Sequence, residues 1–138
     1  MTNTSEQLLE AQGPTEGLRS IKDIISDLSK PLAQRHLKTR RQGGTELTYI
    51  EWHTAVRYLD HYAAGWSYNV KSVSLVGNLV TVVASISIPT IEGIITREAT
   101  GCEPFDTKGY GDPCSNAEAM ALKRAAAKFG LGRYLYEK

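Results

Sequence analysis

The chain has 138 residues, of which 41% are hydrophobic and 22% are charged, so it is long enough for one globular domain with its own core. It contains no apolar run long enough to cross a bilayer, and its N-terminus lacks the features of a signal peptide, so we expect a cytoplasmic protein without a membrane partner. Sixteen Lys and Arg against fifteen Asp and Glu give a net charge of +1, which alone does not indicate nucleic-acid binding.

Residues 1–17 are polar and lack sustained periodicity, so they are predicted to be a flexible tail preceding one domain at 18–138. Apolar residues then recur at helical spacing from Leu18 to Leu28, which predicts an amphipathic helix that ends or bends before Pro31. The segment that follows is compatible with another helical turn before Gly43 and Gly44, and residues 46–48 are expected to be extended.

A second helix is predicted from about Thr48 to Ala63, because Thr48 and Glu51 have the spacing of a capping box. The helical period divides this segment into two faces. The predicted core face holds Trp52, Ala55, Val56, Leu59, Tyr62 and Ala63, and the predicted solvent face holds His53, Arg57, Asp60 and His61. With no acidic ligands clustered beside them, the histidines indicate a polar surface and no metal site.

Three strands follow this helix. Residues 66–71 and 79–88 alternate between apolar and polar side chains, and Gly77-Asn78 between them is a two-residue hairpin signal. A second turn at 89–93 leads into a strand at 94–100, and the glycine- and proline-rich stretch 101–114 is expected to be a loop. The order predicts an α+β fold with a three-stranded antiparallel meander and helices on one face.

The last helix is predicted at 117–129, begun by a capping box of Ser115 and Glu118 and ended by Gly130. Ala119, Leu122, Ala125, Ala126 and Phe129 share the predicted core face. Ala117, Ala121, Arg124 and Lys128 lie opposite, with Lys123 between the two faces. A basic face flanked by alanines is either solvated or open to an anionic partner that approaches closely.

The sequence contains no phosphate-binding loop, dinucleotide fingerprint, metalloprotease motif or nucleophile elbow, so no nucleotide cofactor and no catalytic residue are predicted. Cys102 and Cys114 lack zinc spacing and are expected to be reduced and unpaired. Four loop acids, Glu98, Glu103, Asp106 and Asp112, are the one candidate for a carboxylate metal site of nuclease type.

The basic residues are segregated along the chain. Residues 28–45 contain Lys30, Arg35, Lys38, Arg40 and Arg41, and residues 119–136 contain Lys123, Arg124, Lys128 and Arg133, with no acid in either window. If the two windows meet in space, they form a basic groove on a nearly neutral protein.

Three segments resemble the Rad52-like single-strand annealing proteins, in particular their short bacterial and phage branch that includes DdrA. They are RRQGGTELTYIEW, GWSYNV and ALKRAAAKFGLGRYLY, and the resemblance covers about residues 18 to 138. It implies a β-β-β-α core, assembly of many subunits into a ring or helical array, and single-stranded DNA held in a basic groove without a nucleotide cofactor.

The family's inner-groove Lys-Arg pair corresponds to Lys123 and Arg124, and its basic residue before the double glycine corresponds to Arg40 or Arg41. Lys38, Lys128, Arg133 and Arg97 are second-tier candidates for DNA binding. Asn78 stands at a hairpin tip where a basic residue of larger members can contribute a second DNA site, so the resemblance leaves the existence of that second site open.

The expected function is therefore ATP-independent annealing of complementary single strands in DNA repair or recombination, by a nucleoid-associated homo-oligomer. A single-strand DNA-binding protein is a further candidate partner. Three alternatives stay open at this point, namely end protection without annealing, a carboxylate-metal nuclease, and a purely structural ring.

Overall fold

The computed structural model describes residues 17–105 and 112–137, so all of the predicted tail except Gly17 lies outside the described residues. The elements in chain order are α2 (Ile21–Leu28), η1 (Gln34–His36), β1 (Lys38–Gln42), β2 (Thr45–Tyr49), α3 (Trp52–Tyr62), β3 (Ser67–Val76), β4 (Leu79–Thr90), β5 (Gly93–Pro104), α4 (Pro113–Lys128) and η2 (Arg133–Leu135). Among the described residues, no helix is long and apolar enough to span a membrane. The predicted α+β class is confirmed.

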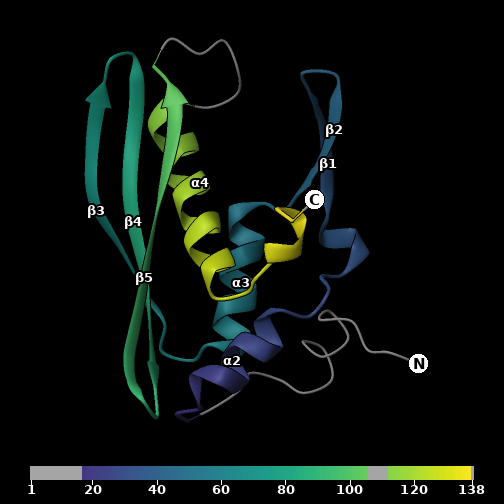
Figure 1. The fold of residues 1–138 in the computed structure, drawn as a ribbon, viewed down its shortest axis with the longest axis vertical. Helices are drawn as coiled ribbons and strands as arrows, with labels where there is room; N and C mark the ends of the chain where they lie inside the picture. The colour runs from purple at the N-terminus through teal and green to yellow at the C-terminus, as the bar shows by residue number, and fades with distance from the viewer. Residues whose placement is uncertain (1–16, 106–111, 138) are drawn as a thin grey trace.

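The strands β3, β4 and β5 form the predicted antiparallel meander in that order. Alternate residues of β4 are buried, from Val80 to Ile88, and α4 lies along this face of the sheet (Figure 1). β5 continues to Pro104, so the predicted loop at 101–114 begins in strand, because Gly101 to Pro104 keep the register with β4. Residues 106–111 of that loop lie outside the described ranges.

The helix α4 begins earlier than predicted. The Asp112 carboxylate accepts hydrogen bonds from the Ser115 N–H (2.7 Å) and the Ser115 hydroxyl (2.9 Å), and Pro113 occupies the first turn, where its missing N–H costs nothing. The predicted capping box is wrong, because the Glu118 side chain accepts a hydrogen bond from the Tyr68 hydroxyl instead. The predicted stop at Gly130 is confirmed, with φ +108° after the last helical residue.

Ala117 and Ala121 of α4 are fully buried against the sheet, so the prediction that they border a face open to a partner is wrong. They lie over Gly101 of β5, where a Cβ atom would be 2.0 Å from the carbonyl oxygen of Ala117 and 2.7 Å from the amide nitrogen of Ala121. Small residues on both elements therefore let the helix backbone lie directly on the strand.

Residues 38–49 form a β-hairpin, where the sequence suggested a helical turn followed by a short extended piece. All five residues of β1 are exposed, so no apolar face holds them in a helix. Gly43 and Gly44 have positive φ angles of +59° and +79°, as a tight two-residue hairpin turn requires. The hairpin projects from the body of the molecule on the side of α4 that faces away from the sheet (Figure 1).

The helix α3 starts at Trp52, after β2 has ended at Tyr49, so Thr48 lies in a strand and the predicted capping box of Thr48 and Glu51 is wrong. Trp52 is 52% exposed although it was assigned to the core face. Tyr58, assigned to neither face, is fully buried, and its hydroxyl lies 2.8 Å from His36 Nδ1.

His61, predicted on the solvent face of α3, is buried instead, where α2 packs on α3. Its ring meets Tyr62 edge-on with centroids 4.6 Å apart, and its Nε2 has no hydrogen-bond partner among the described residues. Burial lowers the pKa of His61, an effect that nearby Asp27 partly offsets. The helix thus buries a wider arc than its apolar residues alone indicate.

Candidate nucleic-acid interface

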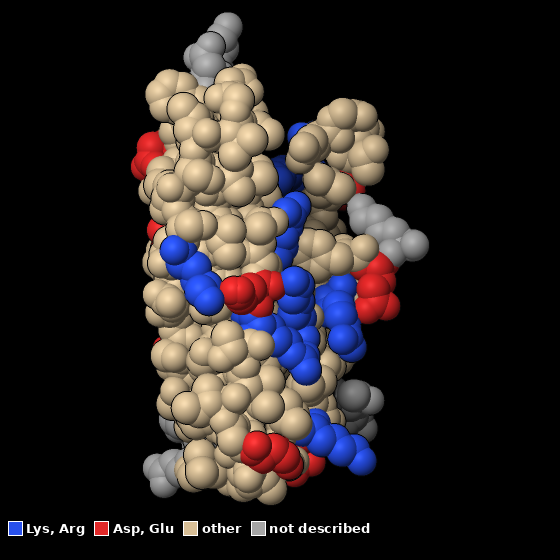
Figure 2. All heavy atoms as spheres, turned by 60° about the vertical axis from the view of Figure 1, so that its left-hand side comes forward, with Lys and Arg blue, Asp and Glu red and all other residues tan. Residues whose placement is uncertain are grey.

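A cleft of about 850 Å³ separates the β1–β2 hairpin from α4. Arg40 and Arg41 reach it from the first basic window, and Lys123 and Arg124 reach it from the second. Figure 2 shows Lys and Arg side chains gathered along the junction between the sheet and the rest of the molecule on one face. The two acid-free windows therefore meet in space, as the sequence suggested.

Tyr49 lies between the two basic walls of this cleft. Its ring centroid is 5.3 Å from the Arg40 guanidinium carbon and 5.3 Å from Lys123 Nζ. The hairpin register explains the first contact, since Lys38 pairs with Tyr49 and Arg40 is two residues further on the same face. The negative ring face attracts both cations and holds them near one another.

Lys123 is half-buried, and its Nζ donates a hydrogen bond to the Ile50 carbonyl oxygen (2.9 Å). Burial lowers the pKa of Lys123, the Arg40 charge lowers it further, and Glu51 opposes the shift. Two cations are thus held close together in a partly desolvated cleft. An anion bound between them would remove their repulsion and restore the solvation that Lys123 has lost.

Arg124 lies at the border between this cleft and the free edge of β5. Its Nη1 donates to the Thr100 carbonyl oxygen (3.2 Å), one helical turn before Lys128 Nζ donates to the Glu98 carbonyl oxygen (2.5 Å). One turn earlier in α4, Met120 Sδ accepts from the Cys102 N–H (3.5 Å). One row of α4 therefore satisfies the outward backbone groups of β5, which an edge strand otherwise leaves open.

The second-tier candidates are not among the described residues that line the cleft. Lys38 Nζ is 4.0 Å from Glu51, and Arg133 Nε is 3.5 Å from Glu137. The Arg97 guanidinium stacks on Phe129 at 4.8 Å and donates to the Lys128 carbonyl oxygen. Of the eight predicted residues, the structure brings together Arg40, Arg41, Lys123 and Arg124.

Neutral side chains that no sequence motif indicated also line the cleft, among them Tyr49, Gln42, Asn116 and Tyr136. The Tyr136 side chain is 56% exposed, and its phenol can donate a hydrogen bond into the cleft. The sequence does contain a signal for Tyr49, namely the pair Gly43-Gly44. If this pair is taken as a hairpin turn, β1 pairs with β2 and Tyr49 lies beside the arginines.

The acids proposed as a metal site point in different directions. Glu98 Oε1 forms an ion pair with Lys71 (3.3 Å), Asp112 caps α4, and Glu103 lines the basic cleft. Asp106 lies outside the described residues. Within residues 17–105 and 112–137, no group of three or more His, Cys, Asp or Glu side chains could hold a metal ion.

Comparison with known proteins assigns the family. The family model for the Rad52/22 family double-strand break repair protein matches residues 20–138. The DNA repair RAD52-like protein 1, mitochondrial, of Arabidopsis thaliana is 40% identical over 128 residues, which are 91% of this chain and 73% of that protein. The DNA repair RAD52-like protein 2, chloroplastic, of the same plant is 37% identical over 125 residues, 87% of this chain and 62% of that protein. The chain therefore belongs to the Rad52/22 family of double-strand break repair proteins.

Proposed function

We propose that this protein binds single-stranded DNA in the basic cleft and anneals complementary strands without ATP, as its part in DNA repair or recombination. The observation that carries the proposal is the pairing of Arg40 and Lys123 around the Tyr49 ring. These cations come from segments far apart in the sequence, and the fold keeps them close although they repel one another. A polyanion such as a nucleic-acid backbone offsets that repulsion.

The cleft suits contacts with phosphate better than the reading of bases. Arg40, Lys123 and Arg124 supply the positive charge, and phosphate contacts position a strand without selecting its sequence. Of the two arginines that the sequence left open, Arg40 is our choice, since it contacts the same ring as Lys123. Base edges left outside the contacts are free to meet a complementary strand.

Annealing in this scheme needs several clefts in a row, because one cleft holds few nucleotides. We therefore infer that the protein assembles with copies of itself into a ring or helical array, in which neutralised backbones lower the repulsion between two strands. The role is one of binding, with no catalytic residue and no cofactor. A single-strand DNA-binding protein that delivers the strand is a candidate partner.

The direct test removes two charges from the cleft in the double variant Arg40→Met/Lys123→Met. Its matched control, Lys22→Met/Arg57→Met, removes one exposed lysine and one exposed arginine that do not line the cleft. Fluorescence measures binding and annealing of labelled complementary oligonucleotides without ATP at several salt concentrations.

The salt slope of log affinity should decrease by about 1.4 in the cleft variant, about 0.7 for each lost phosphate contact, and stay unchanged in the control. Equal slopes in a folded cleft variant would refute the site. Normal binding without annealing in the wild type would refute annealing and leave protection of single strands as the function.

A further inference from the structure

Trp52 is an exposed aromatic residue close to the basic cleft. Its side chain is 52% exposed at the start of α3. Lys123, which lines the cleft, donates to the carbonyl oxygen of Ile50, two positions before Trp52 in the chain. Ala119 of α4 lines both the cleft and a second pocket to which Trp52 belongs. The second pocket therefore adjoins the cleft.

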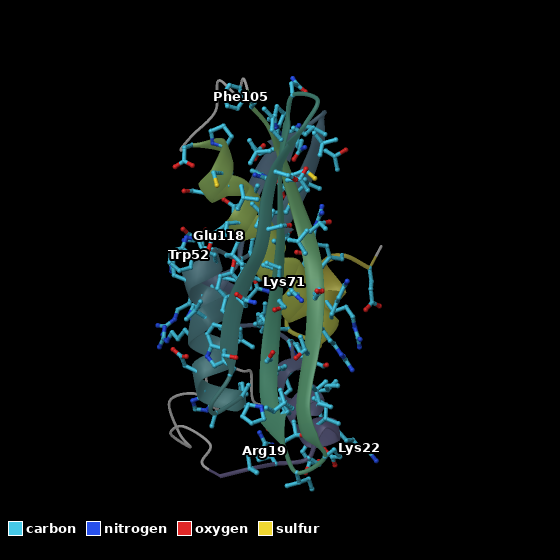
Figure 3. All side chains as sticks on the ribbon, turned by 90° about the vertical axis from the view of Figure 1, so that its left-hand side faces the viewer. Arg19, Lys22, Trp52, Lys71, Phe105 and Glu118 are labelled. Carbon is cyan, nitrogen blue, oxygen red and sulfur yellow. The ribbon has the colours of Figure 1, made fainter. Side chains whose placement is uncertain are left out.

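This second pocket combines aromatic rings with a carboxylate. It has a volume of about 320 Å³ and is lined by Trp52, Tyr68, Ser115, Glu118, Ala119 and Leu122. Figure 3 shows Trp52 and Glu118 beside one another at the edge of the molecule next to β3. The Tyr68 hydroxyl donates to Glu118 Oε2 (3.2 Å), and no described residue donates to Glu118 Oε1. One carboxylate oxygen is thus free to accept a hydrogen bond beside an exposed indole ring.

The cleft and the pocket differ in charge. Arg40, Lys123 and Arg124 make the cleft positive, whereas Glu118 makes the adjoining pocket negative. A nucleotide is divided in the same way, because its phosphate is an anion and its base is a flat ring with neutral N–H donors. A strand whose phosphates lie on the cations cannot place another phosphate beside Glu118, since like charges repel. The part of such a strand that suits the pocket is a base.

We propose that the pocket of Trp52 and Glu118 is a nucleobase site, in which the indole stacks on one base of the bound strand and the carboxylate accepts a hydrogen bond from its exocyclic amino group. This inference deepens the proposed function and rests on it. Stacking on an aromatic ring suits every base. Cytosine, adenine and guanine carry an exocyclic amino group and thymine does not, so the site adds a base preference that phosphate contacts cannot supply.

The nucleobase site also bears on annealing. A base pair uses the same amino group that Glu118 would accept from, and stacking on Trp52 takes the base out of the strand's own stack. The base must therefore leave the pocket when a complementary strand pairs with it. The site holds a strand only while that base is unpaired, and the other bases stay outside it.

Tryptophan fluorescence tests the stacking directly, because the chain has two tryptophans. Trp66 donates to Asp60 (2.7 Å) and lines neither the cleft nor the pocket, so Trp66→Phe leaves Trp52 as the only reporter. A short single-stranded oligonucleotide of mixed sequence should quench this variant and leave Trp52→Phe unquenched. Addition of the complementary strand should restore the emission of Trp52. Emission that does not change while anisotropy shows the labelled strand bound, or that stays quenched in the duplex, would overturn the proposal.

Affinity measurements separate this site from the phosphate contacts. Trp52→Ala should weaken binding about 5- to 150-fold at every salt concentration, the loss expected for one stacked base, with the wild-type salt slope. Phe105→Ala is the matched control, since Phe105 is an exposed aromatic residue (62%) that lines neither the cleft nor the pocket. The cleft variant Arg40→Met/Lys123→Met changes the salt slope instead, so failure of either site is recognised independently. Wild-type affinity in folded Trp52→Ala would overturn the nucleobase site, and the fluorescence of Trp66→Phe decides the outcome if circular dichroism shows Trp52→Ala unfolded.

Glu118→Gln tests the contact with the amino group. The wild type should bind oligo-dC more tightly than oligo-dT, because thymine has a carbonyl oxygen where cytosine has its amino group. A glutamine amide can donate as well as accept, so this variant should bind both strands equally. Tyr68→Phe removes only the hydrogen bond to Glu118 and keeps the carboxylate, so it should keep the preference for oligo-dC. A wild type without preference, or the same preference in Glu118→Gln, would overturn the contact with the amino group.

Discussion

The lowered pKa of Lys123 predicts how DNA binding depends on pH. Burial and the Arg40 charge make this ammonium lose its proton at a lower pH than an exposed lysine does. A phosphate beside Nζ stabilises the charged form, so the complex holds more protons on Lys123 than the free protein does. Affinity for single-stranded DNA should therefore fall as pH rises through the pKa of Lys123 in the free protein.

Loss of one phosphate contact should make the slope of log affinity against log salt concentration less steep by about 0.7. When salt rises fourfold, affinity should therefore fall by a factor that is about 2.6 times smaller than the factor measured with the contact intact. The assay is fluorescence anisotropy with a short labelled strand, over a series of rising pH values that starts at about pH 7.5 and at two salt concentrations. Lys123→Arg is the comparison, because an arginine stays charged over this whole range. The wild type should lose its contact at a pH below the ordinary range of an exposed lysine, and the arginine variant should keep it.

Deprotonation of Lys123 does not itself unfold the protein. Since the folded-state pKa of Lys123 is lowered, the folded protein binds fewer protons than the unfolded chain near that pKa, and the contribution of this group to stability rises with pH. Binding and the Lys123 contribution to stability thus change in opposite directions. Parallel loss of affinity in the wild type and Lys123→Arg would refute the reasoning and assign the pH dependence to other groups.

Three further substitutions test how the site is supported. Gly101→Ala should lower the free energy of unfolding by at least about 1–3 kcal/mol, measured by urea denaturation, because its Cβ would overlap the Ala117 carbonyl oxygen at 2.0 Å. Lys128→Met should leave the salt slope of DNA binding unchanged, since Lys128 Nζ donates to a β5 carbonyl and is not a cleft residue; a reduced slope would make it a DNA contact. The folded state resists protonation of the buried His61 ring, so the free energy of unfolding should fall as pH falls from about 7.5 to about 5. This loss is at most about 1.4 kcal/mol per pH unit for one proton, and His61→Gln should reduce it. Equal acid sensitivity of the glutamine variant would contradict that reading.

The meander and the end of α4 could be predicted from the sequence because local patterns determine them. Alternation along β4 sets one row of side chains against α4, and Gly77 and Gly130 supply positive φ angles where a turn and a helix end need them. These signals depend on near neighbours in the chain. They need no knowledge of what packs across from them.

The hairpin and the inward face of α4 could not be predicted in the same way. The β1 strand of the hairpin has no buried residue, so the spacing of apolar residues does not indicate a strand there. Only Gly43 and Gly44, with the positive φ angles of a tight turn, indicate two paired strands. Ala117 and Ala121 were assigned to the open face because small residues fit both a surface and a close contact. Gly101 of β5 favours the close contact, because it leaves room for the helix backbone on the strand. The residue pattern of the helix alone does not show which strand residue lies opposite.

The helix α4 connects these observations, because its four sides meet four different surroundings. Ala117 and Ala121 lie on β4 and β5, the row from Met120 to Lys128 closes the β5 edge, Lys123 points into the cleft, and Glu118 faces β3. A shift of this helix along the sheet would therefore disturb the DNA cleft and the β5 edge together. Gly101 fixes how closely the helix lies on the strand, and it does not line the cleft. Gly101→Ala should accordingly weaken binding of single-stranded DNA although it leaves every basic residue of the cleft in place.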